Sequence, residues 1–392
     1  MKPTATRRRI TSALAATTLM FGGAGVAAVA ATTASAAAAP TTVYVATTGH
    51  DSSTCGTSSA PCATIGQGVT NASAGDTVSV AAGTYNEQVV VPKTLMLVGH
   101  SAVVDPKGAT TGSGTSMDAA AIEVLPTASG TTIQGFTVQG ATGEGILVVS
   151  ARHVTIRGNQ VSNNDVGTPS TTTYAECQPQ GNVPGDCGEG IHLMSADLST
   201  VIGNSITQNS GGVLVTDELG PAFGNLIANN YVAANLFDCG ITLPSHSTTA
   251  VGFGGRPVPS RGGVYGNRVL HNRIIGNGIL GDGAGVLIAA AASGGASYNN
   301  LVANNVIYGN GLAGVTLHAH APRQYISGNV IQGNLIGTNN VSGDPDARVF
   351  ATTGVLVYSA VPRVHVVVVI RHNVIIGNFH AIWTTPNVRV IH

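Results

Sequence analysis

The feature that most constrains this chain is an asparagine repeat. The pattern Asn-x-(Ile/Val)-x-x-Asn recurs eight times between residues 159 and 378. Recurrence on this scale indicates a repeat architecture, in which each copy is one short unit that buries its apolar face by stacking on its neighbours. The eight pairs are Asn159/Asn164, Asn204/Asn209, Asn230/Asn235, Asn272/Asn277, Asn305/Asn310, Asn329/Asn334, Asn334/Asn339 and Asn373/Asn378.

A second pattern is a glycine followed by alternating apolar residues. This alternation is typical of short strands. The spacings between successive copies are 45, 22, 28, 45, 29, 40 and 27 residues, which a rung of about 22 residues with insertions of varying length explains. The strands open at Gly145, Gly190, Gly212, Gly240, Gly285, Gly314 and Gly354, and Ala381 takes this place in the last copy.

The two patterns together predict an all-β solenoid. No helical segment separates the strands, and a coil that winds around can pair each strand with its copy one rung along, in parallel. The first and third residues after each glycine, such as Ile191 and Leu193, then form stacked inward columns. Apolar columns of this kind fill the bore, so we expect a packed core rather than a channel.

The asparagines have a structural interpretation and a functional one. Asparagine tolerates the left-handed backbone of a tight corner, and copies about 4.8 Å apart can link their side-chain amides along the stack. The alternative is an exposed array that reads sugar hydroxyls or ice. That array would need flat outward columns of Asn or Thr, whereas Thr is scattered among the rungs, so the structural interpretation is favoured.

The N-terminal segment predicts export. Residues 1–39 combine a basic start, an apolar stretch rich in Ala, Thr and Gly, and an A-x-A cleavage site at Ala34–Ala36. An uncleaved anchor is less favoured because the segment is rich in Thr and Gly for a lipid span. We therefore expect a secreted protein with a signal peptide at 1–39, an N-terminal cap and first rungs at 40–110, and β-helix repeats at 111–392.

The cysteines agree with an oxidising compartment. Cys55 and Cys62 bracket one short loop, and Cys177 and Cys187 bracket another, so we expect two local disulfides. Cys239 is left over, and we expect a small buried thiol there rather than a reactive or metal-binding one.

The charge balance excludes some partners. Only 9% of residues are charged, and after cleavage 13 Lys and Arg stand against 18 Asp and Glu, a net charge of −5. Nucleic acids and anionic membranes reward clustered basic residues. We therefore expect neither as a partner, and no stable membrane insertion after signal cleavage.

The N-terminal strings resemble the opening of a known group. They are similar to secreted right-handed parallel β-helix proteins of the pectate-lyase-like superfamily, and the later rungs resemble its β-helix repeat. The resemblance covers about residues 42–390 and implies the fold. The strings are Val43-Tyr44-Val45-Ala46, Cys62-Ala63-Thr64-Ile65, Gly75-Asp76-Thr77-Val78, Gly83-Thr84-Tyr85-Asn86-Glu87 and Leu95-Met96-Leu97-Val98-Gly99.

The resemblance implies a range of functions and assigns none of them. The superfamily includes polysaccharide lyases, hydrolases, epimerases, and maturation factors of the nitrous-oxide-reductase type. The hydrolase motifs Asn-Thr-Asp, Asp-Asp, Gly-His-Gly and Arg-x-Lys are absent from the sequence. The Asp-Pro-His motif of alginate epimerases has only Asp344-Pro345-Asp346 as its nearest string. If the protein is an enzyme, a lyase or epimerase is therefore favoured over a hydrolase.

The resemblance also implies that ligands lie across the first strand of each rung. Aligning rungs on the glycine places Glu218 beside His246, and His318 beside Tyr358, about 5 Å apart. A His/Tyr pair near an arginine can abstract a proton beside a uronate carboxylate. The catalytic candidates are Glu218, His246, His318, His320, Arg323 and Tyr358. The substrate-binding candidates are Glu189, His192, Asp238, Arg256 and Arg261, with His192 expected to face outward.

Three functional hypotheses follow. An extracellular polysaccharide is the expected partner, bound or processed at this face. Alternatively, two or three of Glu218, His246, His318 and His320 hold a divalent cation. The third hypothesis is a structural or adhesive surface protein. If the protein is catalytic, we expect five side chains to lie within about 10 Å of one another: Glu218, His246, His318, His320 and Arg323.

Overall fold

The computed structural model describes residues 39–106, 120–164, 189–281, 283–361, 364 and 366–392. Pro40–His392 form one unit. Residues 1–38 of the predicted signal peptide, the Cys177–Cys187 pair and the boundary at residues 110 and 111 lie outside the described residues. Within the part of the chain that the structure describes, no helix is long and apolar enough to cross a membrane.

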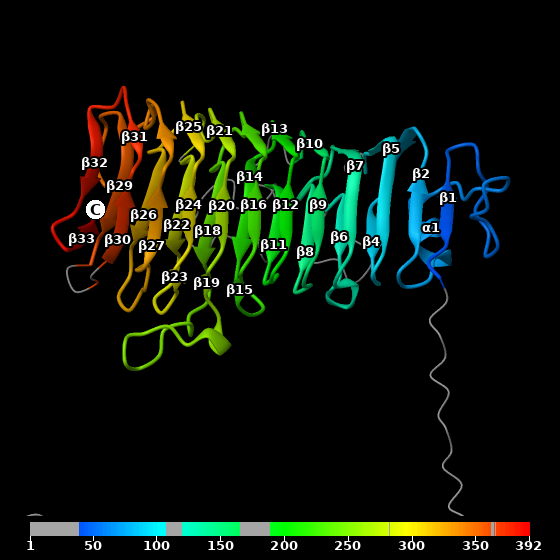
Figure 1. Ribbon diagram of the computed structural model, residues 1–392, viewed down its shortest axis with the longest axis horizontal. Helices are drawn as coiled ribbons and strands as arrows, with labels where there is room; N and C mark the ends of the chain where they lie inside the picture. The colour runs from blue at the N-terminus through cyan, green and yellow to red at the C-terminus, as the bar shows by residue number, and fades with distance from the viewer. Residues whose placement is uncertain (1–38, 107–119, 165–188, 282, 362–363, 365) are drawn as a thin grey trace, which may run out of the picture. The chain divides into compact units, whose positions relative to one another are not determined.

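One face of the unit is a sheet of ten parallel strands (Figure 1). Each strand pairs with its copy on the next rung in the register that the glycine pattern predicts, for example Ile191 with Val213 and Val213 with Ile241. In spatial order the strands are β4 (Val89–Val91), β6 (Ile122–Val124), β8 (Ile146–Val149), β11 (Glu189–Met194), β14 (Gly211–Thr216), β18 (Ile241–Ser245), β22 (Val286–Ala290), β26 (Val315–Ala319), β29 (Thr353–Ser359) and β32 (His380–Thr384).

A sheet of twenty parallel strands closes the rest of the coil, in two columns that meet at β5 and β7. The first column is β1 (Thr42–Val45), β2 (Thr77–Val80), β5 (Met96–Val104), β7 (Thr132–Val138), β9 (Thr155–Arg157), β12 (Thr200–Ile202), β16 (Leu226–Ala228), β20 (Arg268–Leu270), β24 (Leu301–Ala303), β27 (Asn329–Gln332), β30 (Val366–Arg371) and β33 (Val388–Ile391). The second is β3 (Gly83–Tyr85), β10 (Gln160–Ser162), β13 (Ser205–Thr207), β17 (Tyr231–Ala233), β21 (Arg273–Ile275), β25 (Val306–Tyr308), β28 (Leu335–Ile336) and β31 (Val374–Ile375).

Short elements complete the rungs. The short strands that come after β14, β18 and β22 along the chain form a three-stranded parallel sheet. The aromatic rings of this sheet stack from rung to rung. The sheet consists of β15 (Ala222–Phe223), β19 (Val264–Tyr265) and β23 (Ser297–Tyr298). Two short 3-10 helices lie at Pro126–Ala128 and Pro259–Arg261.

The bore is a dry core, as predicted. Ile191, Leu193, Val213 and Val215 are fully buried and belong to one continuous apolar cluster that runs along the stack. Each such side chain contributes about 1.5–3 kcal/mol by its removal from water. The all-β parallel β-helix predicted from the repeats is confirmed.

The glycine that opens each strand is required by a close approach. A Cβ on Gly212 would lie 2.1 Å from the backbone oxygen of Gly240 on the next rung. At Gly190 and Gly240 it would also meet the side-chain amide of Asn209 or Asn277, at 2.9 and 2.8 Å. The glycine that opens a strand therefore packs against the side-chain amide of a ladder asparagine, and the two sequence patterns reflect this one contact.

The asparagines form buried ladders, and they differ from expectation in one respect. In each ladder the side-chain Nδ2 donates to the Oδ1 of the next copy, as Asn230 does to Asn272 at 3.0 Å. The left-handed backbone belongs to the preceding residue, such as Asn229 or His271, because the ladder side chain must turn inward at the corner. A third ladder is Asn225, Asn267, Asn300 and Asn329, and its first three members lie outside the eight pairs.

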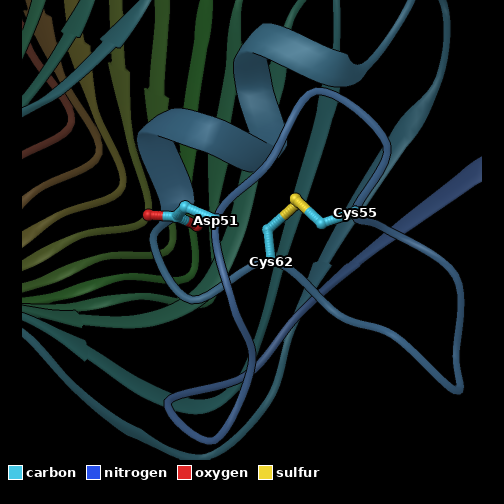
Figure 2. Close-up of side chains that lie close together, drawn as sticks. All are labelled: Asp51, Cys55 and Cys62. Atoms are coloured by element: carbon cyan, nitrogen blue, oxygen red, sulfur yellow. A yellow bond between two sulfur atoms is a disulfide. The ribbon is translucent and has the colours of Figure 1, made fainter.

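The N-terminal end is closed by the short helix α1 (Ile65–Asn71), within the segment expected to form a cap. Asp51 accepts hydrogen bonds from the backbone N–H of Ala63 and Thr64, and Glu87 accepts from the first N–H groups of the helix. The disulfide Cys55–Cys62 lies beside it, as predicted (Figure 2). Acceptors at a helix N-terminus satisfy donors that have no partner inside the helix.

Cys239 is a buried thiol, as expected. Its Sγ accepts a hydrogen bond from the backbone N–H of Ala284 at 3.1 Å. Burial raises the pKa of the Cys239 thiol well above its usual value, so the reactive thiolate is disfavoured.

Candidate functional site

A polar cleft of about 490 Å³ lies where β14 and β18 end. Its floor comes from Asp217, Glu218 and His246, and its wall from the segment between β18 and β19, which extends away from the stack (Figure 1). The full lining is Asp217, Glu218, Leu219, Gly220, His246, Ser247, Thr248, Thr249, Ser260 and Arg261.

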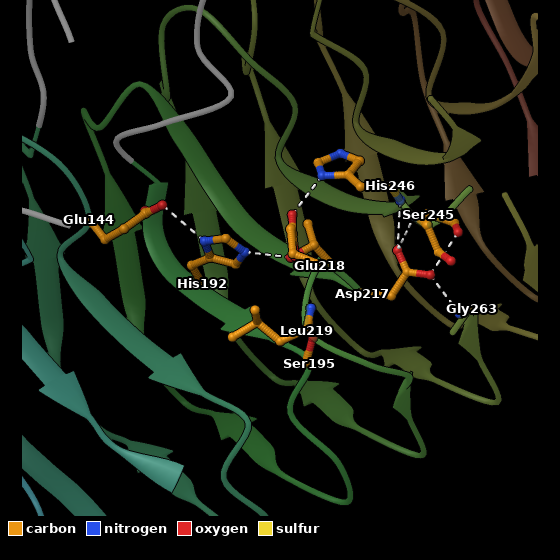
Figure 3. Close-up of polar contacts among 11 residues, drawn as sticks. Glu144, His192, Ser195, Asp217, Glu218, Leu219, Ser245, His246 and Gly263 are labelled. Carbon is orange, nitrogen blue, oxygen red and sulfur yellow. Dashed lines mark hydrogen bonds and ion pairs between the residues drawn. The ribbon is translucent and has the colours of Figure 1, made fainter. Parts of the chain in front are cut away.

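Glu218 and His246 form a dyad across neighbouring rungs (Figure 3). Nδ1 of His246 lies 2.6 Å from Oε1 of Glu218, and the two side chains are 17% and 22% exposed. Burial by itself raises the pKa of Glu218, but the hydrogen bond and charge of His246, with the charge of His192, outweigh it and lower this pKa to about 2. Glu218 is therefore an anion that holds His246 in one orientation.

Asp217 holds the cleft wall in place through hydrogen bonds. Its carboxylate accepts hydrogen bonds from the Ser245 hydroxyl and from the backbone N–H of His246, Ser247 and Gly263 (Figure 3). Burial raises the pKa of Asp217, and these donors oppose that rise. This single side chain fixes both ends of the segment that forms the cleft wall.

A second histidine dyad lies beneath the cleft. His192 Nδ1 is 3.0 Å from Glu144 Oε1, and its Nε2 is 2.7 Å from the hydroxyl of Thr216 (Figure 3). His192 is on the outer side of its strand, as predicted, but it is buried rather than exposed. Glu144 and Thr216 occupy both ring nitrogens, so His192 is held inside the fold and is not placed to contact a ligand.

The other substrate-binding candidates divide into two groups. Glu189 and Asp238 are buried, at 1% and 4% exposure. Both pack against Gly211, on the side where the chain enters the strands. Arg261 lines the cleft, and Arg256 is exposed farther along the same segment, outside the lining.

A separate cluster gathers three of the remaining catalytic candidates. The rings of His318, His320 and Tyr358 pack edge to face, with centroids 5.0–5.8 Å apart. His318 Nε2 lies 3.0 Å from Oδ2 of the buried Asp344. Burial raises the pKa of Asp344, but the hydrogen bond and charge of His318 outweigh it, so this pKa is lowered.

The five residues expected to converge do not form one site. Glu218 and His246 follow β14 and β18, whereas His318 and His320 belong to β26 and its end, two rungs beyond β18. Because β26 is three rungs beyond β14, strand spacing alone separates Glu218 from His318 by about 14 Å, more than the expected 10 Å. Arg323 donates to the backbone oxygen of Val251 at 3.2 Å and so joins two outer loops.

Sequence reasoning missed Glu144, Asp217, Asp344 and Asp346 as members of these clusters. Asp217 had a usable signal, because it directly precedes Glu218 at the end of the same strand. The others had none, since Glu144 lies 48 residues from its partner and Asp344 lies 26 residues from its partner.

Comparison with known structures agrees with this architecture. The alginate lyase from Paenibacillus sp. str. FPU-7 superposes with a TM-score of 0.51 at 14% identity, over 89% of this chain and 99% of that one. This protein is a right-handed parallel β-helix. At this identity the likeness concerns the fold alone.

Further comparisons are weaker. The Azotobacter vinelandii mannuronan C-5 epimerase AlgE4 A-module gives a TM-score of 0.46 at 13% identity, over 81% of this chain and 91% of that one. The periplasmic copper-binding protein (NosD) family matches residues 69–251, a little under half of the chain. No curated protein matches the sequence. The NosD match and the Cys55–Cys62 disulfide indicate a non-cytoplasmic location.

The NosD description implies copper, and the matched segment does not fit it. Among the described residues of 69–251, no three His, Cys, Asp or Glu side chains bring ligand atoms within 4.8 Å of one another. A group at Asp51, Cys55 and Cys62 lies before the segment, and its two cysteines are bonded to each other. A second group with ligand atoms within 4.8 Å of one another lies beyond the matched segment. It consists of His318, His320 and Asp346.

Proposed function

We propose that this β-helix binds and processes an acidic extracellular polysaccharide in the cleft between Glu218 and Arg261. The observation that carries the proposal is the Glu218–His246 dyad, which lines the cleft with both side chains partly exposed. Such a pair, a histidine oriented by an anionic carboxylate, is suited to proton transfer.

In this proposal His246 is the base. When Nδ1 of a neutral His246 donates to Glu218, the ring lone pair lies on Nε2. Nε2 then removes the proton on the uronate carbon that bears the carboxylate. Glu218 stabilises the imidazolium that results, because its low pKa keeps it charged beside His246.

Two outcomes follow from that proton transfer. In elimination, the electron pair of the broken C–H bond forms a carbon–carbon double bond, the neighbouring glycosidic C–O bond breaks, and the leaving oxygen takes up a proton. In epimerisation, a proton returns to the same carbon from the opposite face. Both need a positive group on the substrate carboxylate, and Arg261 in the cleft wall is suited to that role.

The choice of substrate class takes one protein of the same fold as its starting point. The Paenibacillus protein of the same fold is an alginate lyase by description, which makes alginate the first substrate to test. Basic residues are scarce in this protein, and Arg256 and Arg261 lie in one segment beside the cleft. We expect these two arginines to contact an acidic polysaccharide.

The test is a screen of the purified chain, expressed with an export signal, against alginate, pectate and neutral glucans. Unsaturated products, new reducing ends and solvent-deuterium incorporation are followed in parallel. The proposal predicts a signal on acidic substrates in the first or third readout. Binding without any reaction would favour the adhesive alternative, and neither binding nor reaction would overturn the proposal.

A further inference from the structure

A second constellation lies two rungs beyond the cleft, and the proposed reaction does not use it. His318 is on β26, and His320 follows at the end of the same strand. Residues two apart on a strand point to the same side, and the intervening Ala319 is fully buried in the bore. Both imidazoles therefore stand on the outer face, with ring centroids 5.0 Å apart.

A tight turn brings two carboxylates against these rings. Asp344 pairs with Val349 in an antiparallel bridge, and its Oδ1 accepts from the N–H of Ala347 at 2.9 Å. This turn presents Asp346 to His320 and Asp344 to His318. One ligand atom each from His318, His320 and Asp346 lies within 4.8 Å of the other two.

The spacing suits a bound ion better than a direct bond. His320 Nε2 is 3.8 Å from Asp346 Oδ2, beyond hydrogen-bonding distance. Two donors that each lie about 2.0–2.2 Å from one metal ion are separated by up to about 4 Å. The two side chains are 37% and 61% exposed, so an ion can reach them from solvent.

The buried carboxylate completes the arrangement. Asp344 is fully buried and lies 3.0 Å from Nε2 of His318. When Nε2–H donates to Asp344, the lone pair of His318 lies on Nδ1. Metal-binding histidines commonly donate their other ring N–H to a carboxylate in this way, which fixes the tautomer and the ring orientation.

We infer that His318, His320 and Asp346 bind a divalent transition-metal ion, with Asp344 positioning His318. Two imidazoles and one carboxylate suit Zn²⁺ and Cu²⁺, with Cu²⁺ the tighter of the two. They do not suit Ca²⁺ or Mg²⁺, which take oxygen ligands. The inference is independent of the polysaccharide proposal, because it involves other residues and another part of the sheet.

The chain carries its own reporter for this site. Trp383 is the sole tryptophan in the sequence, and it packs with Tyr358 against one apolar cluster beside the histidines. Tyr358 in turn contacts both imidazole rings. A paramagnetic Cu²⁺ ion bound here should quench Trp383 fluorescence, whereas Zn²⁺ should not quench it in this way.

The experiment is calorimetric titration of the tag-free mature chain with Cu²⁺, Zn²⁺ and Ca²⁺, with Trp383 fluorescence as a second readout. We expect one Cu²⁺ or Zn²⁺ per chain and no Ca²⁺. His320→Ala and Asp346→Ala should each weaken Cu²⁺ binding at least about tenfold and remove the quenching. His100→Ala, an exposed histidine on β5 that bonds Ser79, is the control and should bind as the unmodified chain does.

Two results would overturn the inference. One is the absence of stoichiometric Cu²⁺ and Zn²⁺ binding by the unmodified chain. The other is unchanged affinity in Asp346→Ala, whose side chain is the more exposed of the two and can be removed without a cavity. Circular dichroism of each variant shows that it is folded, and Asp346→Ala decides the question if His320→Ala does not fold.

Discussion

Nδ1 of His246 lies 2.6 Å from Oε1 of Glu218, although 28 residues separate the two in the chain. The contact exists because parallel pairing of β14 with β18 brings equivalent positions of consecutive rungs together. Neighbouring strands are about 4.8 Å apart, which is the distance that two facing side chains of this size can bridge. A repeat that serves stability thus also creates a pair with acid–base character.

The first prediction concerns this dyad. His246→Gln should lower turnover on a responsive acidic polysaccharide by about 10²–10⁴-fold, because it removes the base. Glu218→Gln should lower it less, since His246 remains but loses its orienting anion. Initial rates of product formation measure both. His100→Gln should leave the rate unchanged, and a His246→Gln variant of full activity would contradict the assignment.

The second prediction concerns pH and Glu218. The pKa of Glu218 falls from 4.5 to about 2 in the folded chain, so its ionised form stabilises the fold at pH above 4.5. That contribution is lost as the pH falls from about 4.5 toward 2. Urea unfolding should therefore show Glu218→Gln as less stable than the unmodified chain at pH 5, with the difference shrinking toward pH 2. A difference independent of pH would contradict the ion pair.

The third prediction concerns the asparagine ladder. Asn272 accepts from the backbone N–H and Nδ2 of Asn230, and it donates to Asn305 and to the backbone oxygen of Ile227. Asn272→Ala leaves buried groups without partners, at about 1–3 kcal/mol for each unsatisfied group. Thermal and urea unfolding should show a clear loss of stability. Asn378→Ala, at the partly exposed end of a ladder, should cost distinctly less.

The fourth prediction concerns the glycine column. Gly212→Ala places a methyl group 2.1 Å from the backbone oxygen of Gly240, so two rungs must separate. Overpacking of this kind costs about 1–3 kcal/mol or more. Gly254→Ala is the matched control, because nothing lies within 4 Å of its added Cβ. Equal unfolding midpoints for the two variants would show that the approach of the rungs is not tight.

Much of the fold could be read from the sequence because a solenoid repeats its contacts locally. The glycine that opens each strand and the asparagine at each corner recur wherever the same close approach recurs, as at Gly190 and Asn209. Aligning rungs on the glycine even predicted the neighbours His318 and Tyr358, which the strand register bears out. The Cys55–Cys62 bridge was predictable for the same reason, since it closes a short loop.

The composition of each site depended on segments that break the repeat. Loops of different lengths leave the strands, and their paths are set by contacts such as Asp217 with Gly263 and His318 with Asp344, which no period encodes. The sequence by itself determined the stack, its inward columns and the register of its strands, because those follow from a repeated local pattern. The tertiary structure alone decided that His192 is buried between Glu144 and Thr216 and that the candidate histidines form two clusters. Burial and loop placement depend on which distant segments pack over each strand end.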